Sequence, residues 1–140
     1  MEVLYLDCGR RRPQLKRNPL GSAIMHLDTL GPDEARSEAS RLAAALADRM
    51  LAGTENLIAG ARELQRLGRW IVPDTRVDKD FVVLLAFDSE TDHLPVDEER
   101  KNWDPAALQR KDREIAEYEK KWSQRVRAAC SSIISRFGAA

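Results

Sequence analysis

The sequence is poor in several kinds of residue, and each shortage excludes a class of protein. Aromatic residues make up 6% of the chain, and there are only 7 glycines and 6 prolines in 140 residues. This composition disfavours a β-sandwich or a low-complexity chain. No apolar run reaches the roughly 18 residues that a membrane span requires. The first apolar stretch is short and its basic residues follow it, which is not the order of a secretory signal. We therefore expect a cytoplasmic protein.

Cysteine and histidine are also scarce, with two of each. Cys8 and Cys130 form neither a CxxC pair nor a disulfide framework. Cys130 falls within an apolar stripe, where a small buried thiol is the simplest interpretation. Because His26 and His93 are the only imidazoles, nothing in the sequence supports a cysteine nucleophile with an activating base.

Acidic and basic residues balance at 23 each, but they are separated along the chain. Residues 9–17 hold five basic and no acidic side chains, whereas residues 74–99 hold nine acidic and two basic ones. Residues 104–140 carry eight basic and five acidic side chains. A neutral chain with an acidic middle lacks the clustered basic face that phosphate binding requires, so nucleic acid is disfavoured as a partner. A basic protein or a cation is a better candidate partner for a chain with an acidic middle.

Residues 1–31 are predicted to form an N-terminal arm that is partly flexible. Residues 2–7 have the composition of a short strand, and loop-forming residues follow them. A solvated arm is the simplest interpretation, and folding onto the acidic middle of the chain is an alternative. A weaker alternative is contact with nucleic acid through the basic residues of the arm, which are Arg10, Arg11, Arg12, Lys16 and Arg17.

Residues 32–68 are predicted to be one helical stretch that is interrupted at Gly53, and two separate helices are the alternative. Pro32 suits a first helical position. Apolar residues recur at three- and four-residue steps on both sides of the interruption. Thr54 and Glu55 are the candidate caps for a restart.

The apolar run at residues 81–87, FVVLLAF, fits a helix or a strand. A strand would need residues 2–7 as its partner, and an isolated two-stranded pair is only marginally stable. We therefore predict a helix that is capped by Asp78 or Asp80. The alternative is an α+β fold with a minor two-stranded pair from residues 2–7 and 81–87.

The clearest predicted element is a C-terminal helix of roughly 33 residues, longer than most helices of globular proteins. Asp104 and Pro105 suit its first positions, and Gly138 stands where it should stop. With the other helices it predicts an all-α fold, a single-domain antiparallel bundle over residues 32–140. A homodimer and burial within one domain explain its length equally well. Its apolar stripe consists of Leu108, Ile115, Tyr118, Trp122, Val126, Ala129, Ile133 and Phe137.

The segment SETDHLP contains candidate metal ligands. Its acids have part of the spacing of a calcium loop, but His93 stands where that loop needs glycine. Glu90, Asp92 and His93 include one Glu-x-x-His motif, whereas ferritin-like bundles need two. A divalent metal bound by these three residues is therefore an alternative, and an ordinary helix end with capping residues is the simpler interpretation.

The acidic segment 74–99 is the predicted contact face for a partner. Trp70 and Trp103 flank it, and tryptophan is frequent among the residues that dominate binding, although packing in the core explains both more simply. Arg100 is predicted to pair with a carboxylate of the SETDHLP loop and so to organise it. The predicted contact residues are Trp70, Asp88, Glu90, Asp92, His93, Arg100 and Trp103.

The stretches LIAGARELQRL and SETDHLPVDEERKNW, followed by a long final helix, resemble a family of small uncharacterised bacterial proteins. The similarity covers about residues 50–137, and its most particular part is SETDHLP with Arg100 and Trp103 downstream. The resemblance implies a bacterial cytoplasmic origin, and it favours Glu90, Asp92 and His93 as part of one surface with those two residues.

Together these observations predict a binding protein rather than an enzyme. The predicted function is a non-catalytic protein-binding module that meets a basic protein through residues 74–99. Its size and charge asymmetry suggest, by analogy alone, a bacterial immunity or antitoxin-type protein. The alternative is a metal-dependent enzyme or metal sensor that uses Glu90, Asp92 and His93.

Overall fold

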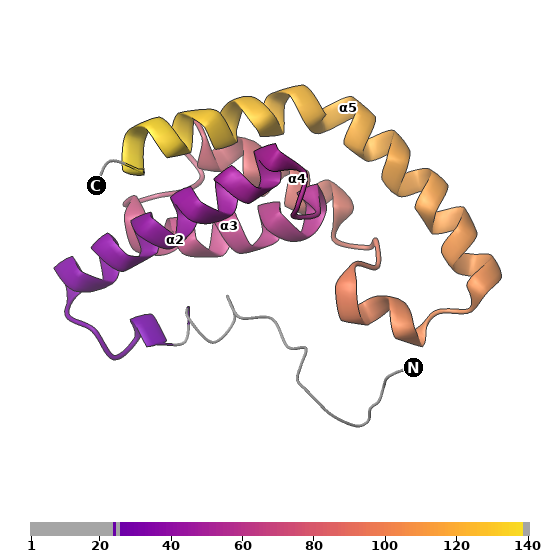
Figure 1. Ribbon diagram of the computed structural model, residues 1–140, viewed down its shortest axis with the longest axis horizontal. Coiled ribbons are helices and arrows are strands. Elements are labelled where there is room, and N and C mark those ends of the chain that lie inside the picture. The colour runs from indigo at the N-terminus through magenta and orange to yellow at the C-terminus, as the bar shows by residue number, and fades with distance from the viewer. Residues whose placement is uncertain (1–23, 25, 139–140) are drawn as a thin grey trace.

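The computed structural model describes residue 24 and residues 26–138, and every regular element in that part of the chain is a helix (Figure 1). The all-α fold predicted from the sequence is confirmed. The elements in chain order are α2 (Pro32–Ala52), α3 (Leu57–Ile71), α4 (Phe81–Thr91), the short 3-10 helix η2 (Asp97–Asn102) and α5 (Pro105–Phe137).

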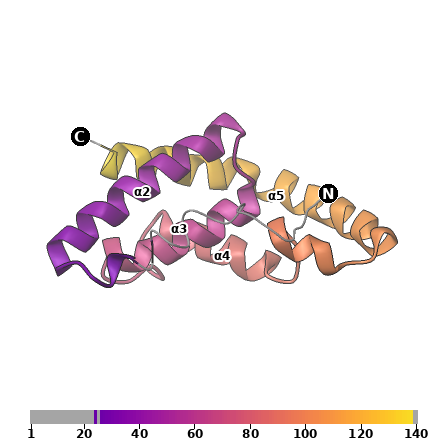
Figure 2. The same ribbon diagram turned by 60° about the horizontal axis from the view of Figure 1, so that its bottom comes forward.

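Four helices pack in a bundle around one core. α2 lies against α3 and α5, α3 also packs against α4, and α4 packs against α5. In Figures 1 and 2 the C-terminal half of α5 lies along the bundle, while its N-terminal half extends away from α2 and α3 and leads back to η2. The segment between α4 and α5 therefore lies at one end of the molecule.

α2 and α3 are two separate helices, so the prediction of a single interrupted stretch is wrong. Gly53 has a φ of 83° and closes α2 in the left-handed conformation, which residues with a Cβ rarely adopt. Asn56 begins α3, and its Oδ1 accepts a hydrogen bond of 2.9 Å from the backbone N–H of Ala59. Neither Thr54 nor Glu55 is the cap. The chain reverses at this turn, and α3 packs back against α2.

The apolar run 81–87 is helical, as predicted. Buried phenylalanines stand at both ends of the run, and they face α3 and α5, the two helices that enclose α4. Asp78 provides the cap, because its Oδ2 accepts 3.1 Å hydrogen bonds from the backbone N–H groups of Asp80 and Phe81. The α+β alternative is wrong for residues 81–87; residues 2–7 lie outside the described residues.

α5 confirms the predicted stripe and both of its ends. Asp104 Oδ2 accepts hydrogen bonds from two backbone N–H groups of the first turn, and the helix ends at Phe137. Cys130 is fully buried, and burial raises the pKa of its thiol to about 11, which makes it unreactive. No helix in the described part of the chain is both long and apolar enough to cross a bilayer. The buried stripe residues are Ile115, Trp122, Val126, Ala129 and Ile133.

The core also includes the end of the predicted N-terminal arm. Leu27 has no exposed surface, and Ile24 and Leu30 pack against the same core. The described residues before α2 therefore lie against the bundle. The remainder of the arm, and with it the predicted flexibility, lies outside the described residues.

Two glycines of α3 allow the helices to approach closely. A Cβ on Gly68 would lie 2.6 Å from Cδ1 of Phe81, and one on Gly60 would lie 2.5 Å from Sδ of Met50. Phe81 is fully buried, and its ring lies 6.4 Å from that of Phe137. The Phe81 ring has little space to move, whereas the unbranched side chain of Met50 adapts more easily.

We expect Gly68→Ala to lower the free energy of unfolding by about 1–3 kcal/mol, because overpacking against Phe81 outweighs the helix propensity of alanine. Gly60→Ala is the matched control on the same helix, and we expect it to change stability by less than about 1 kcal/mol. Urea unfolding of both variants measures the difference. A Gly68→Ala protein as stable as the parent would contradict the close α3–α4 contact.

Candidate functional site

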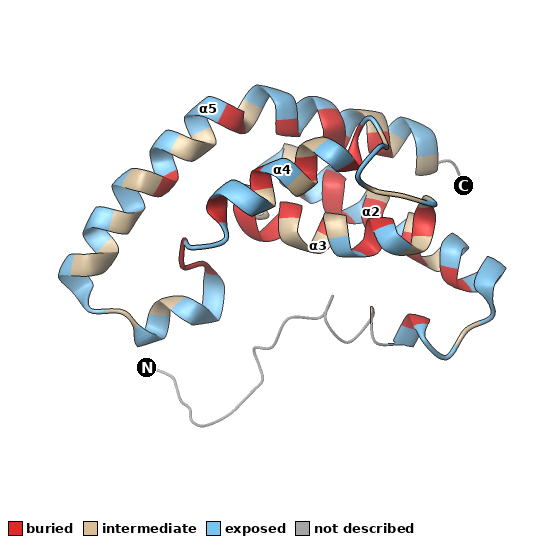
Figure 3. Cartoon of the chain, turned by 180° about the vertical axis from the view of Figure 1, so that it is seen from behind, coloured by how far each residue is buried: buried red, intermediate tan, exposed pale blue. Residues whose placement is uncertain are grey.

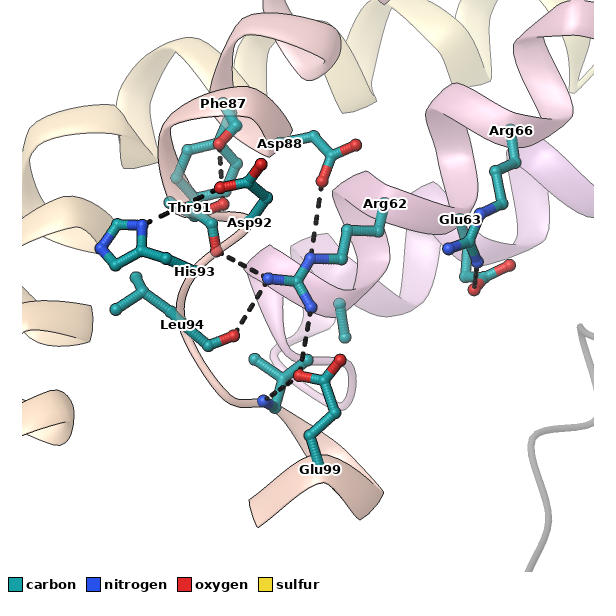
Figure 4. A network of polar contacts seen from close by, with 12 residues as sticks. Arg62, Glu63, Arg66, Phe87, Asp88, Thr91, Asp92, His93, Leu94 and Glu99 are labelled. Atoms are coloured by element: carbon teal, nitrogen blue, oxygen red, sulfur yellow. Dashed lines mark hydrogen bonds and ion pairs between the residues drawn. The ribbon is translucent and has the colours of Figure 1, made fainter. Parts of the chain in front are cut away.

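Arg62 of α3 holds the C-terminal end of α4 and the turn after it (Figure 4). Its Nη2 donates hydrogen bonds to the carbonyl oxygens of Thr91 (2.6 Å) and Leu94 (3.1 Å). Its Nε lies 3.5 Å from Oδ1 of Asp88, and its Nη1 lies 3.5 Å from Oε1 of Glu99. Only 13% of the Arg62 side chain is exposed. One guanidinium therefore connects α3 to the end of α4, to the turn that follows it and to η2.

This contact is needed because the last carbonyl groups of a helix have no partner within it. Leu94, Pro95 and Val96 are buried beside the helix end, which limits the access of water to these carbonyls. Two further bonds close the same turn. Thr91 Oγ1 donates to the carbonyl oxygen of Phe87 (2.7 Å), and the Val96 N–H donates to Glu99 Oε1 (3.1 Å), which gives the turn a single well-supported conformation.

The fixed turn presents a group of acidic side chains to solvent. The exposed side-chain fractions are 74% for Asp92, 67% for Glu98 and 59% for Glu99. Asp97, which is also exposed, has a φ of 50° at the start of η2. We call Asp92, Asp97, Glu98 and Glu99 the acidic end.

The N-terminal end of α4 is held by a second arginine, Arg136 of α5. Arg136 donates to both carboxylate oxygens of Asp78 (2.7 and 3.0 Å) and to Oδ2 of Asp80 (2.7 Å). Ser132 Oγ donates to the same oxygen of Asp80 (2.6 Å). The hydrogen bonds from Arg136, and then those from the backbone N–H groups, lower the pKa of Asp78 to about 2 despite its partial burial. These two acids serve the fold and are not free for a partner.

Two of the predicted contact residues on α4 are likewise engaged within the chain. Asp88 faces Arg62, and burial raises the pKa of its carboxyl group more than that charge lowers it. Glu90 Oε1 accepts a 3.3 Å hydrogen bond from the indole N–H of Trp122 and lies 4.0 Å from Nζ of Lys121. Trp122 is buried in the core, as its place in the stripe predicts.

His93 bridges the turn to α5. Its Nε2 lies 2.8 Å from Oε2 of Glu114, whose other oxygen accepts from Lys111 (3.2 Å), and both contacts lower the pKa of that carboxyl group. The imidazole edge meets the ring of Tyr118 at a centroid distance of 6.0 Å. Asp92 lies 4.0 Å from Nδ1 on the other side.

The predicted pairing of Arg100 with Glu90 or Asp92 is wrong. Arg100 instead makes a two-pronged pair with Asp112 of α5, at 2.8 and 3.0 Å. This pair fixes η2 to the N-terminal half of α5, a contact between segments that the turn at Asp104 brings together. The pKa of Asp112 is lowered by the hydrogen bonds from Arg100.

The two flanking tryptophans lie at different ends of the molecule. Trp103 is half-buried next to η2, and Nζ of Lys111 lies 5.9 Å from its ring centroid. Trp70 packs partly against the core in the last turn of α3, close in sequence to Gly68, which contacts the first residue of α4. Because the acidic end adjoins the last residue of α4, Trp70 does not join the other predicted contact residues.

Two of the three predicted metal ligands have separate partners on α5, and the third, Asp92, lies 4.0 Å from His93. Glu90 binds Trp122 and His93 binds Glu114. Within residue 24 and residues 26–138, no group of three or more His, Cys, Asp or Glu side chains is placed to hold a metal ion. The geometry therefore gives no support to the metal alternative. The predicted phosphate-contact residues Arg10, Arg11, Arg12, Lys16 and Arg17 lie outside the described residues.

Sequence reasoning missed the residues that organise this region, namely Arg62 and Arg136. Both lie in helices among many other charged residues, and no local pattern marks them. It also missed Glu63, whose pKa is raised by burial. One carboxylate oxygen of Glu63 pairs with Arg66, and the other is the one buried side-chain N or O atom without a hydrogen bond in the described part of the chain.

Comparison with known proteins adds no relative. No family model, no curated protein and no solved structure matches the chain. The resemblance to small bacterial proteins therefore stays a prediction.

We expect Arg62→Leu to lower the free energy of unfolding by about 2–4 kcal/mol, because it leaves the Leu94 carbonyl oxygen without a donor and the partly buried Asp88 without its ion pair. The Thr91 carbonyl oxygen keeps only the Leu94 N–H, at 3.0 Å. Hydrogen exchange should show lost protection first in the backbone amides of residues 91–96. Arg69→Leu is the matched control on the same helix, because its side chain is exposed and has no ion pair with a described residue. Equal losses in the two variants would contradict the special role of Arg62.

The Asp78–Arg136 pair predicts a pH dependence of stability. Because the folded-state pKa of Asp78 is about 2, below its ordinary value of 3.8, its contribution is complete above pH 3.8 and is lost as the pH falls through about 2. At neutral pH, Asp78→Asn should lower stability by about 1–2 kcal/mol, because it weakens charge-assisted hydrogen bonds whose contribution is reduced by partial exposure.

Urea unfolding from pH 7 down to pH 2 measures this effect. The stability difference between the parent and Asp78→Asn should narrow below pH 4. Asp48→Asn is the control, because Asp48 is exposed on α2, and its difference from the parent should stay flat. A difference for Asp78→Asn that stays constant down to pH 2 would contradict the assignment.

Proposed function

We propose that the protein is a protein-binding module that recognises a basic partner through the acidic end. The observation that carries this proposal is the exposure of Asp92, Glu98 and Glu99 on a turn that Arg62 holds in place. Glu98 pairs with Lys101, and Glu99 accepts from the Val96 N–H, yet both side chains are more than half exposed. Asp78 and Asp80, by contrast, are held by Arg136.

The rigidity of the turn supports a role in binding. Ordering a flexible loop on association costs about 0.5–1.5 kcal/mol for each immobilised side chain, and a preformed surface avoids part of that cost. Here the backbone between α4 and η2 is already fixed by the bonds from Arg62 and by the buried side chains of Leu94 and Val96. Like charges held close together also speed the encounter with a partner of opposite charge.

Trp103 and His93 complete the proposed face. Trp103 follows η2 directly and is only half-buried, and 42% of the His93 side chain is exposed. A partly exposed tryptophan beside a charged rim is the usual arrangement of an interface anchor. The contact face predicted from the sequence is thereby narrowed. It retains Asp92, His93 and Trp103. The other four predicted residues, Trp70, Asp88, Glu90 and Arg100, have contacts within the fold.

Within this class, the immunity or antitoxin type is the finer proposal. Such a protein would cover a basic functional surface of its partner, and an acidic end on a small bundle fits that task. The support is charge complementarity and size alone. If the proposal is right, the partner should lose its activity in a one-to-one complex and recover it at high salt.

The test uses the double variant Asp92→Lys/Glu98→Lys. The full-length protein, immobilised, captures its partner, and the purified partner is then titrated by calorimetry against the parent and the variant. We expect affinity to fall by about tenfold or more, because like charges meet across the interface. The control Asp28→Lys/Asp48→Lys changes the net charge equally at exposed sites elsewhere, and should bind as the parent does.

Two results would refute the proposal. One is a partner that binds the Asp92→Lys/Glu98→Lys protein and the parent equally well. The other is the failure of any stoichiometric, salt-sensitive partner to bind the parent. Circular dichroism and urea unfolding of both variants confirm that each is folded.

A further inference from the structure

The outer face of α5 carries a second charged surface, of the opposite sign. The residues of α5 that enter the core lie on one side of the helix, and the side chains opposite them are exposed (Figure 3). From the first to the last charged residue, this exposed line consists of Arg110, Arg113, Glu117, Lys120, Lys121, Gln124 and Arg127. We call it the basic strip. It holds five positive charges and one negative charge.

The spacing of the strip is regular. Arg113, Lys120 and Arg127 are seven residues apart, which places them about 10.5 Å apart along nearly one line of the helix. From Arg110 to Arg127 the strip extends about 26 Å, at about 1.5 Å per residue. The helix that carries it is continuous over this length.

Of the four acidic residues of α5, only Glu117 lies on the strip, which leaves the strip unbalanced. Asp112 pairs with Arg100, and Glu114 pairs with His93 and Lys111. Arg110, Arg113 and Lys120 have no ion pair with any described residue, and Arg127 donates only to a backbone carbonyl oxygen at the end of α2. Lys121 lies 4.0 Å from Glu90. α5 holds eight basic and four acidic residues, and five of the eight basic residues lie on the strip.

We propose that the basic strip binds the phosphate backbone of duplex nucleic acid. A line of arginine and lysine side chains complements the regular negative charge of a duplex, about one charge per 1.7 Å of axis. The strip has no exposed aromatic or large apolar side chain. A protein partner would need such anchors, and single strands are usually bound by stacking on aromatic rings. The contact is with the backbone and is independent of base sequence.

The strip consists of other residues than the predicted nucleic-acid contact at 9–17. It is also distinct from the acidic end, so neither proposal depends on the other. Nucleic acid was disfavoured from the sequence because the chain is neutral, has an acidic middle and showed no clustered basic face. The strip is such a cluster, formed where α5 places basic residues of 110–127 on one exposed side.

The test measures fluorescence anisotropy of a labelled mixed-sequence DNA duplex of about 20 base pairs, titrated with the full-length protein between about 50 and 200 mM salt. We expect binding at the low salt concentration, and a logarithmic slope of the affinity against salt between about −3 and −4.5, the limit set by five phosphate contacts. A labelled oligoglutamate is titrated in parallel as the acidic polypeptide.

The decisive variant is Arg113→Glu/Lys120→Glu. We expect its affinity for the duplex to fall by about tenfold or more and its salt slope to shrink by about two. The matched control Arg36→Glu/Arg69→Glu makes the same change in net charge at exposed arginines of α2 and α3 that have no ion pair with described residues. It should stay within about threefold of the parent, since distant charges are screened.

Several outcomes would overturn the proposal. These are no saturable duplex binding by the parent at the lowest salt, equal losses in the strip variant and its control, and binding of oligoglutamate but not of the duplex. A third variant, Arg11→Glu/Arg12→Glu, tests residues 9–17. Loss of binding in this variant, with parent-like binding by the strip variant, would assign the contact to those residues and refute the strip. Urea unfolding of each variant confirms the fold.

Discussion

The guanidinium group of Arg62 is the contact on which the arrangement of the molecule's acidic end depends. α4 ends next to a buried turn, in which the Leu94 N–H donates to the Thr91 carbonyl oxygen but the Leu94 carbonyl oxygen depends on a donor from another element. Arg62 provides that donor from α3 and reaches Asp88 and Glu99 with the same group. The turn then directs the chain into η2 and on to α5. If the turn moved, the pairs that join η2 and the turn to α5 would move with it.

α4 shows why polar contacts are concentrated at the ends of a helix in this fold. It packs against α3 and α5, its middle is strongly apolar, and its position along the bundle axis is set poorly by such residues alone. Arg136 fixes its first turn through Asp78 and Asp80, and Arg62 fixes its last. These two arginines pair with Asp78, Asp80 and Asp88 of the acidic segment. The same contacts decide which acids remain on the surface, so the fold and the electrostatics of the candidate site have one origin.

Those parts of the fold that depend on residues close together in the chain were predictable from the sequence. The candidate site was not, because it depends on contacts between distant residues. The cap at Asp104 and the long stripe of α5 each depend on residues close in sequence, and they were predicted correctly. The division of α2 from α3 was missed, although Gly53 marked the place, because an isolated glycine permits either a bend or a reversal. Arg100 was assigned to the wrong acid, since its real partner Asp112 becomes a neighbour only after the chain turns at Asp104.

The all-α architecture follows from the sequence alone, because helix periodicity and capping are properties of short segments. The sequence also shows where the charged segments lie, but not which of their side chains are paired and which are exposed. Packing of the helices places Asp78, Asp80 and Asp88 beside arginines and leaves Asp92 and Glu98 exposed. It also leaves five of the basic residues of α5 on the exposed side of that helix. A charge acts through distance and burial, and both are set by the contacts between helices from distant parts of the chain.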